Sequence, residues 1–430
     1  MKKLSAACFI SALLFLSCNS IEPPVSSNEP ELKLEFLDVS CTEAWIKIST
    51  SDISLPANIK LLKNDNLSQI INLISPDTIL YVDSLLPKQT YHFKSSALNL
   101  QSAIESNEIE VNTMDTTSHN FTWQTYTFGG QAGSCVLNDV AIINANDIWA
   151  VGEIYLLDSL GQPDPLPYNA VHWDGSQWEV KRIQTIFRGS LVTVPLEGIF
   201  AFSATDIWVV GSLPIHGDGD NWTMYDLRTT VNPNLSLSKV WGCSTNDVYF
   251  VGRSGSIAHY QNGQWSKIES GTDLNINDIW GYTDNSGNQL ILCAASNFGT
   301  NDQKKLLKIN NNSVDTLGWT PQRTLFTLWF KSFDKLYAGG SGIFTNAGNV
   351  WKEEKSLPHN FTFRIRGNDY NDVYATGGLG YFAHFNGYSW YNLSSISLSG
   401  GDYESLDTKG NTTCVVGYSG AKAVVTIIKK

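Results

Sequence analysis

Charged residues are scarce in this sequence. Asp, Glu, Lys and Arg make up 16% of its 430 residues, whereas about 25% is usual in soluble proteins. The 41 acidic residues outnumber the 29 basic ones, which gives a net charge of −12. Binding to a phosphate backbone needs clustered Lys and Arg that displace counterions, and the sequence has no such cluster. We therefore expect no nucleic-acid partner.

Known catalytic motifs are absent as well. The sequence contains no G-x-S-x-G nucleophile elbow, no H-E-x-x-H metal motif and no glycine-rich phosphate loop, each of which fixes the spacing of reactive groups. The Asp-box of sialidases and the tryptophan-docking repeats of quinone-dependent dehydrogenases are also missing. We expect no cofactor and no metal ion, and any catalysis would have to use scattered residues.

Cysteines are few and never closely spaced. Five cysteines follow Cys18 along the chain, namely Cys41, Cys135, Cys243, Cys293 and Cys414. None has the paired spacing of zinc or redox sites. Four of them lie in apolar, strand-like contexts, which predicts buried thiols. A single disulfide is the alternative if the protein is exported.

The long apolar run of this sequence lies at its N-terminus. Two lysines precede residues 4–16, which are too few to span a bilayer as a permanent helix. This pattern predicts a secretory signal peptide over residues 1–17. The following Pro-rich, polar residues 18–30 have almost nothing to bury, so we expect a flexible tether there.

The segment Phe-Leu-Ser-Cys at residues 15–18 resembles the lipobox of bacterial lipoproteins. The resemblance implies cleavage before Cys18 and acylation of its thiol, which would anchor the protein to a membrane without spanning it. Phe15 is the loosest match. The alternative is an ordinary signal peptide in which the cysteine is incidental. The resemblance implies a location in the cell envelope of a Gram-negative bacterium, at the outer membrane.

Residues 31–115 alternate as short strands do. Segments such as LKLEFLDVS, EAWIKIST and TYHFKSSAL are separated by Asn, Asp, Ser and Pro, which predicts a sandwich of six or seven strands. Trp45 on the second strand, and Tyr91 shortly after Leu86-Pro87, resemble the core tryptophan and tyrosine corner of fibronectin type III domains. The resemblance implies packing roles for both residues. No adhesive RGD tripeptide occurs, so we expect a spacer domain.

Residues 119–430 repeat one pattern seven times. Segments such as LSKVWGCSTNDVYFVG and FTFRIRGNDYNDVYATGG are each followed by words such as AHYQNGQW and AHFNGYSW. The turn aspartates Asp206 and Asp247, or Asp334 and Asp372, recur at roughly 40 residues, the length of one four-stranded propeller blade. The repeats resemble those of exported bacterial β-propellers written around DVWAVG and DGxxW. We therefore expect an all-β protein, with a sandwich followed by a seven-bladed propeller.

The seventh repeat has only three strands before the chain ends. The aromatic-rich segment FTWQTYTFGG, residues 121–130, precedes the first repeat and has no inner strands of its own. We expect it to pair as the outer strand of the last blade, because an open seam would leave an unpaired edge.

Repetition separates architecture from function. Residues that recur in the repeats, including the turn aspartates and His172, His259 and His384, are expected to build the blades. Residues outside the pattern are free to bind a ligand. Three apparent insertions after the second strand, at residues 153–170, 212–222 and 296–305, are expected on one rim of the propeller.

The insertions supply the first set of candidate binding residues, which are Asp158, Asp164, His216, Asp218, Asp220, Trp222 and Asn301. Asp218 and Asp220 alternate with glycines, a spacing that is also compatible with Ca²⁺ ligation but lacks a following acidic ligand.

A second candidate set lies on the innermost strands, which line the central channel of a propeller. It consists of Trp241, Trp280, Trp329, Arg364 and Arg366. Aromatic rings with arginines can stack on and hydrogen-bond sugars or anionic groups. The alternative is that the tryptophans pack between blades and the arginines pair with neighbouring carboxylates.

Three functions fit these features. The expected one is non-catalytic recognition of a protein or glycan through the inserted loops, by a monomer. The alternative is a carbohydrate-active enzyme that uses the carboxylates of Asp158, Asp164, Asp218 and Asp220 at the channel mouth. A third is a purely structural envelope component.

Overall fold

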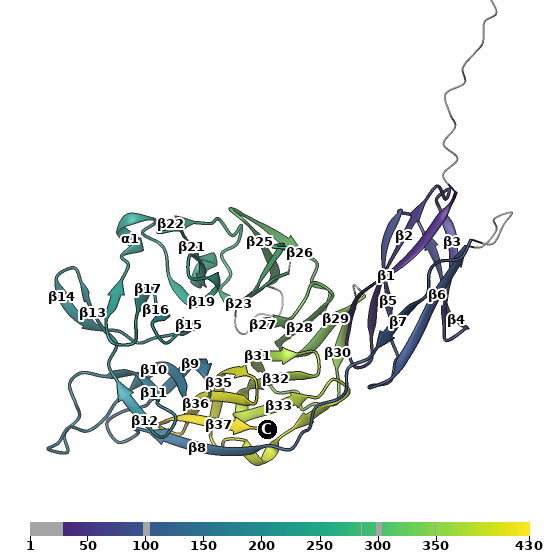
Figure 1. Ribbon diagram of the computed structural model, residues 1–430. Coiled ribbons are helices and arrows are strands. Elements are labelled where there is room, and N and C mark those ends of the chain that lie inside the picture. Colours follow the sequence, from purple (N-terminus) through teal and green to yellow (C-terminus); the bar gives the residue numbers. More distant parts are fainter. Residues whose placement is uncertain (1–28, 98–103, 285, 298–302, 349) are drawn as a thin grey trace, which may run out of the picture.

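The computed structural model describes residues 29–97, 104–284, 286–297, 303–348 and 350–430. Almost every element is a β-strand, as the scarcity of charge and the many Gly, Asn and aromatic residues favour. The strands form two bodies, a two-sheet sandwich and a ring of sheets (Figure 1). Nowhere in these ranges is there a helix with the length and apolar character that a membrane span requires.

The sandwich contains the first seven strands. They are β1 (Glu31–Val39), β2 (Ala44–Ser51), β3 (Ala57–Lys63), β4 (Asn66–Leu73), β5 (Asp77–Val82), β6 (Thr90–Ala97) and β7 (Ile109–Asn112). One sheet has the order β1-β2-β5 and the other β4-β3-β6-β7. Alternate residues such as Ile46, Ile59 and Phe93 are fully buried between the sheets. The backbone N–H of Leu86 donates to the Tyr91 hydroxyl at 2.9 Å, as the predicted tyrosine corner requires.

The predicted position of Trp45 in the sandwich core is wrong. Side chains alternate along a strand, and on β2 it is Ala44, Ile46 and Ile48 that face the core. Trp45 therefore points out of the sandwich, where it is buried against Tyr370 of the ring, with 5.8 Å between ring centroids.

Seven four-stranded antiparallel sheets, here called blades, make up the ring. Blade 1 comprises β9 (Val136–Asn144), β10 (Asp147–Ile154), β11 (Tyr168–Trp173) and β12 (Trp178–Lys181). Blade 2 comprises β15 (Gly198–Ser203), β16 (Asp206–Gly211), β17 (Leu213–Gly217) and β18 (Trp222–Met224). Blade 3 comprises β19 (Leu237–Ser244), β20 (Asp247–Gly252), β21 (Ile257–Gln261) and β22 (Gln264–Lys267). Blade 4 comprises β23 (Ile276–Thr283), β24 (Gln289–Ser296), β25 (Lys304–Asn310) and β26 (Ser313–Leu317).

Blade 5 comprises β27 (Leu325–Phe330), β28 (Lys335–Gly340), β29 (Gly342–Ala347) and β30 (Val350–Glu354). Blade 6 comprises β31 (Thr362–Asp369), β32 (Asp372–Gly377), β33 (Tyr381–Phe385) and β34 (Trp390–Asn392). Blade 7 comprises β35 (Gly401–Lys409), β36 (Thr412–Ser419), β37 (Lys422–Lys429) and β8 (Thr122–Phe128). The innermost strands β9, β15, β19, β23, β27, β31 and β35 contact one another in this cyclic order, so the ring is closed.

The predicted seam is confirmed. Strand β8 pairs antiparallel with β37 along its whole length, from Phe128 opposite Ala423 to Thr122 opposite Lys429. Figure 1 shows β8 running beside β37 near the C-terminus. Blade 7 is thus assembled from both ends of the ring segment, and the open edge of β37 is covered.

The link between blades 1 and 2 holds a hairpin that the repeat pattern does not predict. It consists of β13 (Gln184–Phe187) and β14 (Ser190–Thr193). A short helix, α1 (Leu227–Thr230), lies between blades 2 and 3. Both elements are additions to the link that follows an outermost strand.

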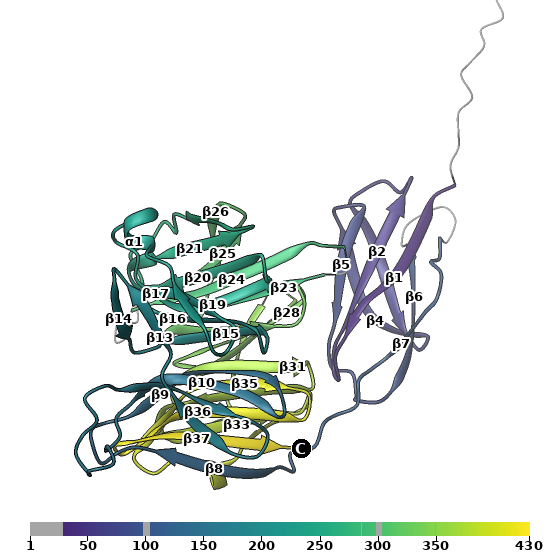
Figure 2. The same ribbon diagram turned by 60° about the vertical axis from the view of Figure 1, so that its left-hand side comes forward.

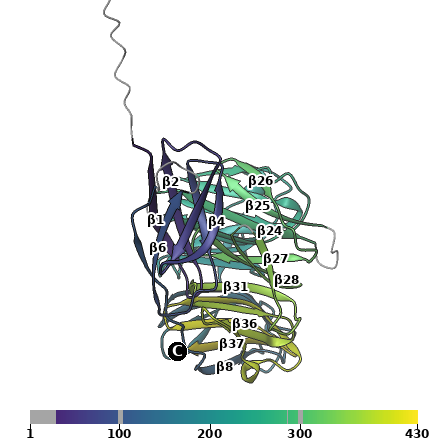
Figure 3. The same ribbon diagram turned by 90° about the vertical axis from the view of Figure 1, so that its right-hand side faces the viewer.

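The antiparallel order of strands gives the ring two distinct faces. The connections between second and third strands, and the links between blades, emerge on one face, called the loop face here. The turns between first and second strands, and between third and fourth strands, emerge on the opposite turn face. The sandwich packs on the turn face, since it contacts Lys335 and Tyr370 at the turns of blades 5 and 6. Figure 2 shows the sandwich beside the ring, and in Figure 3 it lies in front of the ring.

Repeated aspartates and histidines tie the turn face together. The first residue of the second strand accepts a hydrogen bond from a histidine on the third strand in four blades, with N–O distances from 2.6 to 3.0 Å. The pairs are Asp147–His172, Asp206–His216, Asp247–His259 and Asp372–His384. Each imidazole also stacks on the aromatic residue two positions after its aspartate. His172, His259 and His384 are structural, as expected, and His216, which was predicted to bind a ligand, has the same role.

The cysteines after Cys18 are free thiols. Four are buried, and Cys243 is half-buried. The alternative of a disulfide among them is therefore excluded for this structure.

Candidate functional site

The innermost strands share an irregularity near the loop face. In six blades the pairing between the first and second strands skips one residue, which is the signature of a β-bulge. The skipped residues are Asn138, Ser238, Asn277, Phe326, Phe363 and Glu404. In blade 2 Glu197 takes the equivalent place, directly before β15. These seven residues, one from each blade, are called the bulge ring here.

A bulge leaves its extra residue outside the sheet pairing and turns its side chain in a new direction. Every bulge-ring residue is half-buried, although the residues before and after it are mostly buried, as Tyr403 and Ser405 are around Glu404. All of them except Ser238 line one cavity of about 350 Å³, together with Pro195, Lys239, Arg253 and Arg364. This cavity is the loop-face mouth of the central channel.

One wall of the mouth is aromatic. The rings of Phe326 and Phe363 lie 5.8 Å apart and both contact Phe361, each at 5.3 Å between centroids. Such a half-exposed cluster offers apolar surface to a ligand, while its edge-to-face packing keeps the rings in place.

The remaining wall is polar. Glu197 pairs with Arg253 at 3.1 Å, and the amide of Asn138 donates to the Leu196 carbonyl at 2.8 Å. The amide of Asn277 donates to the Ser296 carbonyl at 2.9 Å. The mouth therefore combines an apolar wall with fixed amide and charged groups, the usual composition of a binding site.

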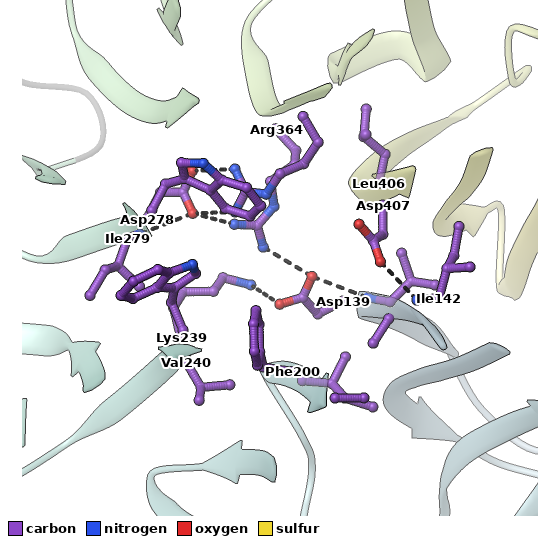
Figure 4. Close-up of a pocket in the computed structure, with 17 residues that line it drawn as sticks. Asp139, Ile142, Phe200, Lys239, Val240, Asp278, Ile279, Arg364, Leu406 and Asp407 are labelled. Carbon is purple, nitrogen blue, oxygen red and sulfur yellow. Dashed lines mark hydrogen bonds and ion pairs between the residues drawn. The ribbon is translucent and has the colours of Figure 1, made fainter. Parts of the chain in front are cut away.

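Below the mouth, buried charges fill the channel. Figure 4 shows Arg364 between Asp139 and Asp278. Its guanidinium donates to Asp278 at 2.5 Å, to Asp139 at 3.0 Å and to the Ser405 hydroxyl at 2.9 Å. Arg366 makes a bidentate pair with Asp278, at 2.8 and 3.0 Å. We call this set the channel network.

Neighbouring blades complete the channel network. Lys239 donates to the Glu197 carbonyl at 2.7 Å and lies 3.5 Å from Asp139. Thr327 donates to Asp278 at 2.6 Å. The network thus takes side chains from blades 1, 3, 4, 5, 6 and 7. In blade 2 the equivalent position, directly after the bulge-ring residue, is Gly198, which has no side chain. A Cβ at Gly198 would lie 2.6 Å from the Ser238 carbonyl oxygen, so no larger residue fits.

The network keeps its carboxylates ionised. Burial by itself would raise the pKa of Asp278, but Arg366 and Arg364 outweigh it and hold that pKa below its usual range. The pKa of Asp139 is lowered in the same way, with burial opposed by Arg364 and Lys239. Asp407 differs, because burial outweighs its hydrogen bonds from the backbone N–H groups of Ile142 and Thr408 and raises its pKa.

A second, smaller cavity of about 80 Å³ lies along the channel beside this network. It has room for a few water molecules. Because Arg364 is bound on three sides and only 4% of its side chain is exposed, the channel network closes the channel beneath the mouth. A ligand entering from the loop face would rest on this network rather than pass through the ring.

Four of the five predicted inner-strand residues, Trp241, Trp280, Arg364 and Arg366, line this channel cavity. Trp241 and Trp329 pack between blades, against Gly281 and Gly367 of the next blade, and are almost fully buried. Trp280 donates to the Phe330 carbonyl at 2.9 Å and lies under the guanidinium of Arg366. For these residues the packing alternative holds.

The arginines also follow the alternative interpretation. Arg364 and Arg366 pair with carboxylates inside the channel and are not open to a ligand through their charges. They support the floor of the mouth.

The loop after β10 contains two of the predicted carboxylates. Asp158 accepts the backbone N–H groups of Leu160 and Gln162, and Asp164 pairs with Arg182 at 2.5 Å. Both carboxylates are thus used in shaping this loop.

The predicted insertion at residues 212–222 is wrong. Residues Leu213–Gly217 form β17, Trp222 begins β18, and the turn between these strands belongs to the turn face. His216 is one of the repeated histidines paired with a turn aspartate, and Trp222 packs on Trp149. This strand contains a proline and lacks the Ala-His-aromatic sequence of blades 3 and 6. The repeat is therefore not recognisable in it from sequence alone.

Asp218 and Asp220 lie in that turn. Oδ1 of Asp218 accepts the backbone N–H groups of Asp220 and Asn221, at 3.0 and 2.7 Å. They are therefore on the face opposite Asp158 and Asp164, so these four carboxylates do not converge on one mouth. The catalytic arrangement proposed for them is wrong.

Two predicted sites fall outside the described residues. Cys18 and Asn301 lie in the ranges 1–28 and 298–302, and the loop 296–305 is described only in part. Within the described ranges, no group of three or more His, Cys, Asp or Glu side chains is placed to hold a metal ion.

Comparison with known proteins identifies the fold. No protein-family model matches the chain, and no curated protein matches it in sequence. Among solved structures, YCF48 bound to a D1 peptide is similar with a TM-score of 0.54 at 15% identity, covering 73% of this chain and 97% of that one. The WD40 β-propeller domain of Doa1 is similar with a TM-score of 0.51 at 14% identity, covering 72% of this chain and 98% of that one.

The ring is a β-propeller. At these identities the similarity shows the fold alone, and it agrees with the all-β class predicted from the repeats.

The bulge ring is the part of the propeller that sequence reasoning missed. A signal for it exists, because Asn138-Asp139, Ser238-Lys239, Asn277-Asp278 and Glu404-Ser405 each place two consecutive polar residues within an otherwise apolar inner strand. A regular strand alternates polar and apolar residues, so two consecutive polar residues in an apolar strand indicate a β-bulge.

Proposed function

We propose that this propeller is a non-catalytic scaffold that binds a segment of another protein at the loop-face mouth. The observation that carries the proposal is the bulge ring, in which six of the seven blades each place one side chain on a single cavity. Bulges weaken sheet pairing, so their recurrence at one level of the ring indicates a purpose other than stability. The closed floor beneath the mouth suits a bound chain segment rather than a transported solute.

The chemistry of the mouth supports a peptide ligand. An aromatic wall formed by Phe326 and Phe363 can hold apolar side chains, and the fixed amides of Asn138 and Asn277 offer polar partners for a backbone. One of the similar propellers was solved with a peptide bound, which is consistent with this proposal.

We also propose that the protein is a lipoprotein of the Gram-negative cell envelope, anchored through Cys18. The N-terminal apolar run, the cysteine that follows it and the polar tether support this location. The sandwich would act as a fibronectin type III spacer, and the strand orders β1-β2-β5 and β4-β3-β6-β7, with the hydrogen bond to Tyr91, support that assignment.

Photo-crosslinking of the full chain in bacterial cells tests the binding site. A photoreactive residue replaces Ser238, which belongs to the bulge ring but does not line the cavity. The control replaces Asn262, which lies in the β21–β22 turn of the same blade on the turn face. We expect discrete protein adducts from position 238 and none from position 262.

Truncation of the aromatic wall sharpens this test. Phe326→Ala with Phe363→Ala is expected to reduce the adducts from position 238 about tenfold or more, because aromatic anchors dominate binding energy. Cys18→Ser is expected to release the protein from the membrane fraction. Adducts that survive loss of both phenylalanines, or adducts with glycan instead of protein, would contradict the proposed site.

A further inference from the structure

The mouth contains one charged group that has no bonded partner among the residues that the structure describes. Glu404 is half-buried on the bulge of β35 and lines the mouth cavity. Among the described residues its carboxylate has no hydrogen bond and no ion pair. A carboxylate taken partly out of water without a directly bonded partner is unfavourable, and the charges of Lys239 and Arg364 act on Glu404 only from a distance.

The side chains of both sequence neighbours anchor the strand around Glu404. The hydroxyl of Tyr403 donates to the Ile396 carbonyl at 2.9 Å, and Ser405 donates to Asp139 at 2.6 Å within the channel network. Both neighbours are fully buried. These anchors fix the backbone position from which the Glu404 side chain extends at the mouth.

The other charges of the mouth are already engaged. Arg253 pairs with Glu197, Lys239 donates to the Glu197 carbonyl and lies beside Asp139, and Arg364 is bound within the channel network. Asp402 is nearby and is held by the N–H of Leu379 and the hydroxyl of Tyr418, at 2.7 and 2.9 Å. None of the cations on the described cavity wall forms an ion pair with Glu404.

We propose that Glu404 binds a cationic side chain, arginine or lysine, from the partner segment at the mouth, with the stem of that side chain lying along Phe363. This inference rests on the proposed peptide-binding function and specifies its ligand. Both residues line the same cavity, and long basic side chains place methylene groups on apolar surface while their charge reaches a polar partner.

Both the local environment of Glu404 and the net charge of the whole chain favour a cationic ligand. Burial, and then the neighbouring Asp402, raise the pKa of Glu404 and outweigh the opposing charges of Lys239 and Arg364, so a directly bound cation would relieve an unfavourable site. The whole chain carries a net charge of −12, which draws basic partners toward it over longer distances. An acidic ligand is disfavoured on both counts.

The test uses two dipeptide probes and the full chain. Acetyl-Phe-Arg-amide and acetyl-Phe-citrulline-amide differ in charge but hardly in shape, and their binding is measured by saturation-transfer NMR. We expect the arginine probe to bind the unmodified protein about tenfold more tightly, since a hydrogen-bonded charge pair contributes on the order of 1.4 kcal/mol or more.

Glu404→Gln keeps the size of the side chain and is expected to abolish the difference between the probes. Glu179→Gln, on exposed outer strand β12, is the matched control and is expected to preserve it. Phe363→Ala is expected to weaken both probes. Thermal unfolding of each variant checks that the fold is intact.

Equal binding of the two probes to the unmodified protein overturns the proposal, as does a preference that survives Glu404→Gln. The peptide-binding function is judged separately, by the adducts from position 238. Adducts that depend on Phe326 and Phe363 but persist unchanged in Glu404→Gln would leave that function in place and remove only the cation subsite.

Discussion

At the scale of single residues, the structure sorts repeated side chains from unique ones. His216 has the same partners as His172, His259 and His384, so a residue selected as an exception to the repeat is in fact one of its members. Glu404, by contrast, sits at a position that every blade has and only this blade fills with an unpaired charge. Repetition of a position and repetition of a residue type are different signals.

Another unique residue is His119, in the segment that joins the sandwich to β8. Its Nδ1 lies 2.9 Å from Nδ1 of His384, whose Nε2 lies 3.0 Å from Asp372. Asp372 also pairs with Lys430. Burial is the main cause that lowers the pKa of both imidazoles, which favours their neutral forms. A neutral His384 that donates from Nε2 to the carboxylate accepts a hydrogen bond at Nδ1 from His119.

This pair predicts a loss of stability in mild acid. Burial, and then the neighbouring His384, lower the pKa of His119 from 6.5 to about 4. Between these values the unfolded chain binds more protons, so the free energy of unfolding falls as the pH decreases from about 6.5 to about 4. Urea unfolding at several pH values should show that His119→Phe has a weaker dependence on pH in this window. Parallel curves for the variant and the unmodified protein would contradict the assignment.

At the scale of elements, the seam is the joint on which ring closure depends. The other outer strands follow their own blades in sequence, whereas β8 is separated from β37 by almost the whole ring segment. Its pairing therefore has a large loop-closure cost, but it converts a chain of blades into a closed ring. The sequence alone predicted this joint, because the seventh repeat has only three strands and the strand before the first repeat belongs to no repeat of its own.

Deletion of residues 121–128 is expected to abolish cooperative unfolding and to cause aggregation, because the edge of β37 and the apolar contacts of Tyr126 and Phe128 would be exposed. Removal of residues 184–193, the β13–β14 hairpin, is the control. Among the described strands that hairpin pairs only with itself, and its contacts outside include those of Arg188 with Asp226 and of Phe187 with a neighbouring apolar cluster. We therefore expect its removal to leave a single thermal transition. A closed, cooperative ring after deletion of β8 would show that the seam is dispensable.

At the scale of the whole molecule, the sandwich and the propeller share a buried contact. Lys335 lies 2.8 Å from the carboxylate of Glu43, and both side chains are nearly buried. The hydroxyl of Tyr370 donates to Asp38 at 2.8 Å, and its ring contacts the ring of Trp45. The sandwich is thus fixed on the turn face, and the mouth opens on the opposite face.

Trp45→Ala tests whether this contact couples the two bodies. Removal of a buried tryptophan costs about 3–5 kcal/mol, and here the loss falls on the contact rather than on either core. We expect calorimetry to show one transition for the unmodified protein and two for the variant. Phe36→Ala is the control, since Phe36 is 44% exposed on the same sheet. Two transitions in the unmodified protein would contradict the coupling.

The sequence by itself determined the all-β class, the repeat length and the closing strand. These features follow from local rules, since turn residues, strand alternation and a missing strand can each be read from neighbouring residues. These local rules fail for the strand Leu213–Gly217, which the sequence predicts to be a loop. The reason is that this strand contains a proline and lacks the Ala-His-aromatic sequence of blades 3 and 6.

Only the tertiary structure decided where the candidate site lies. The bulge ring and the channel network draw residues from different blades that are up to 266 positions apart in sequence, such as Asp139 and Ser405, and these meet only when the ring closes. Orientation also depended on pairing, because a strand turns alternate residues to opposite sides. That alternation carried Trp45 out of the sandwich core, whereas a bulge turned Glu404 into the mouth.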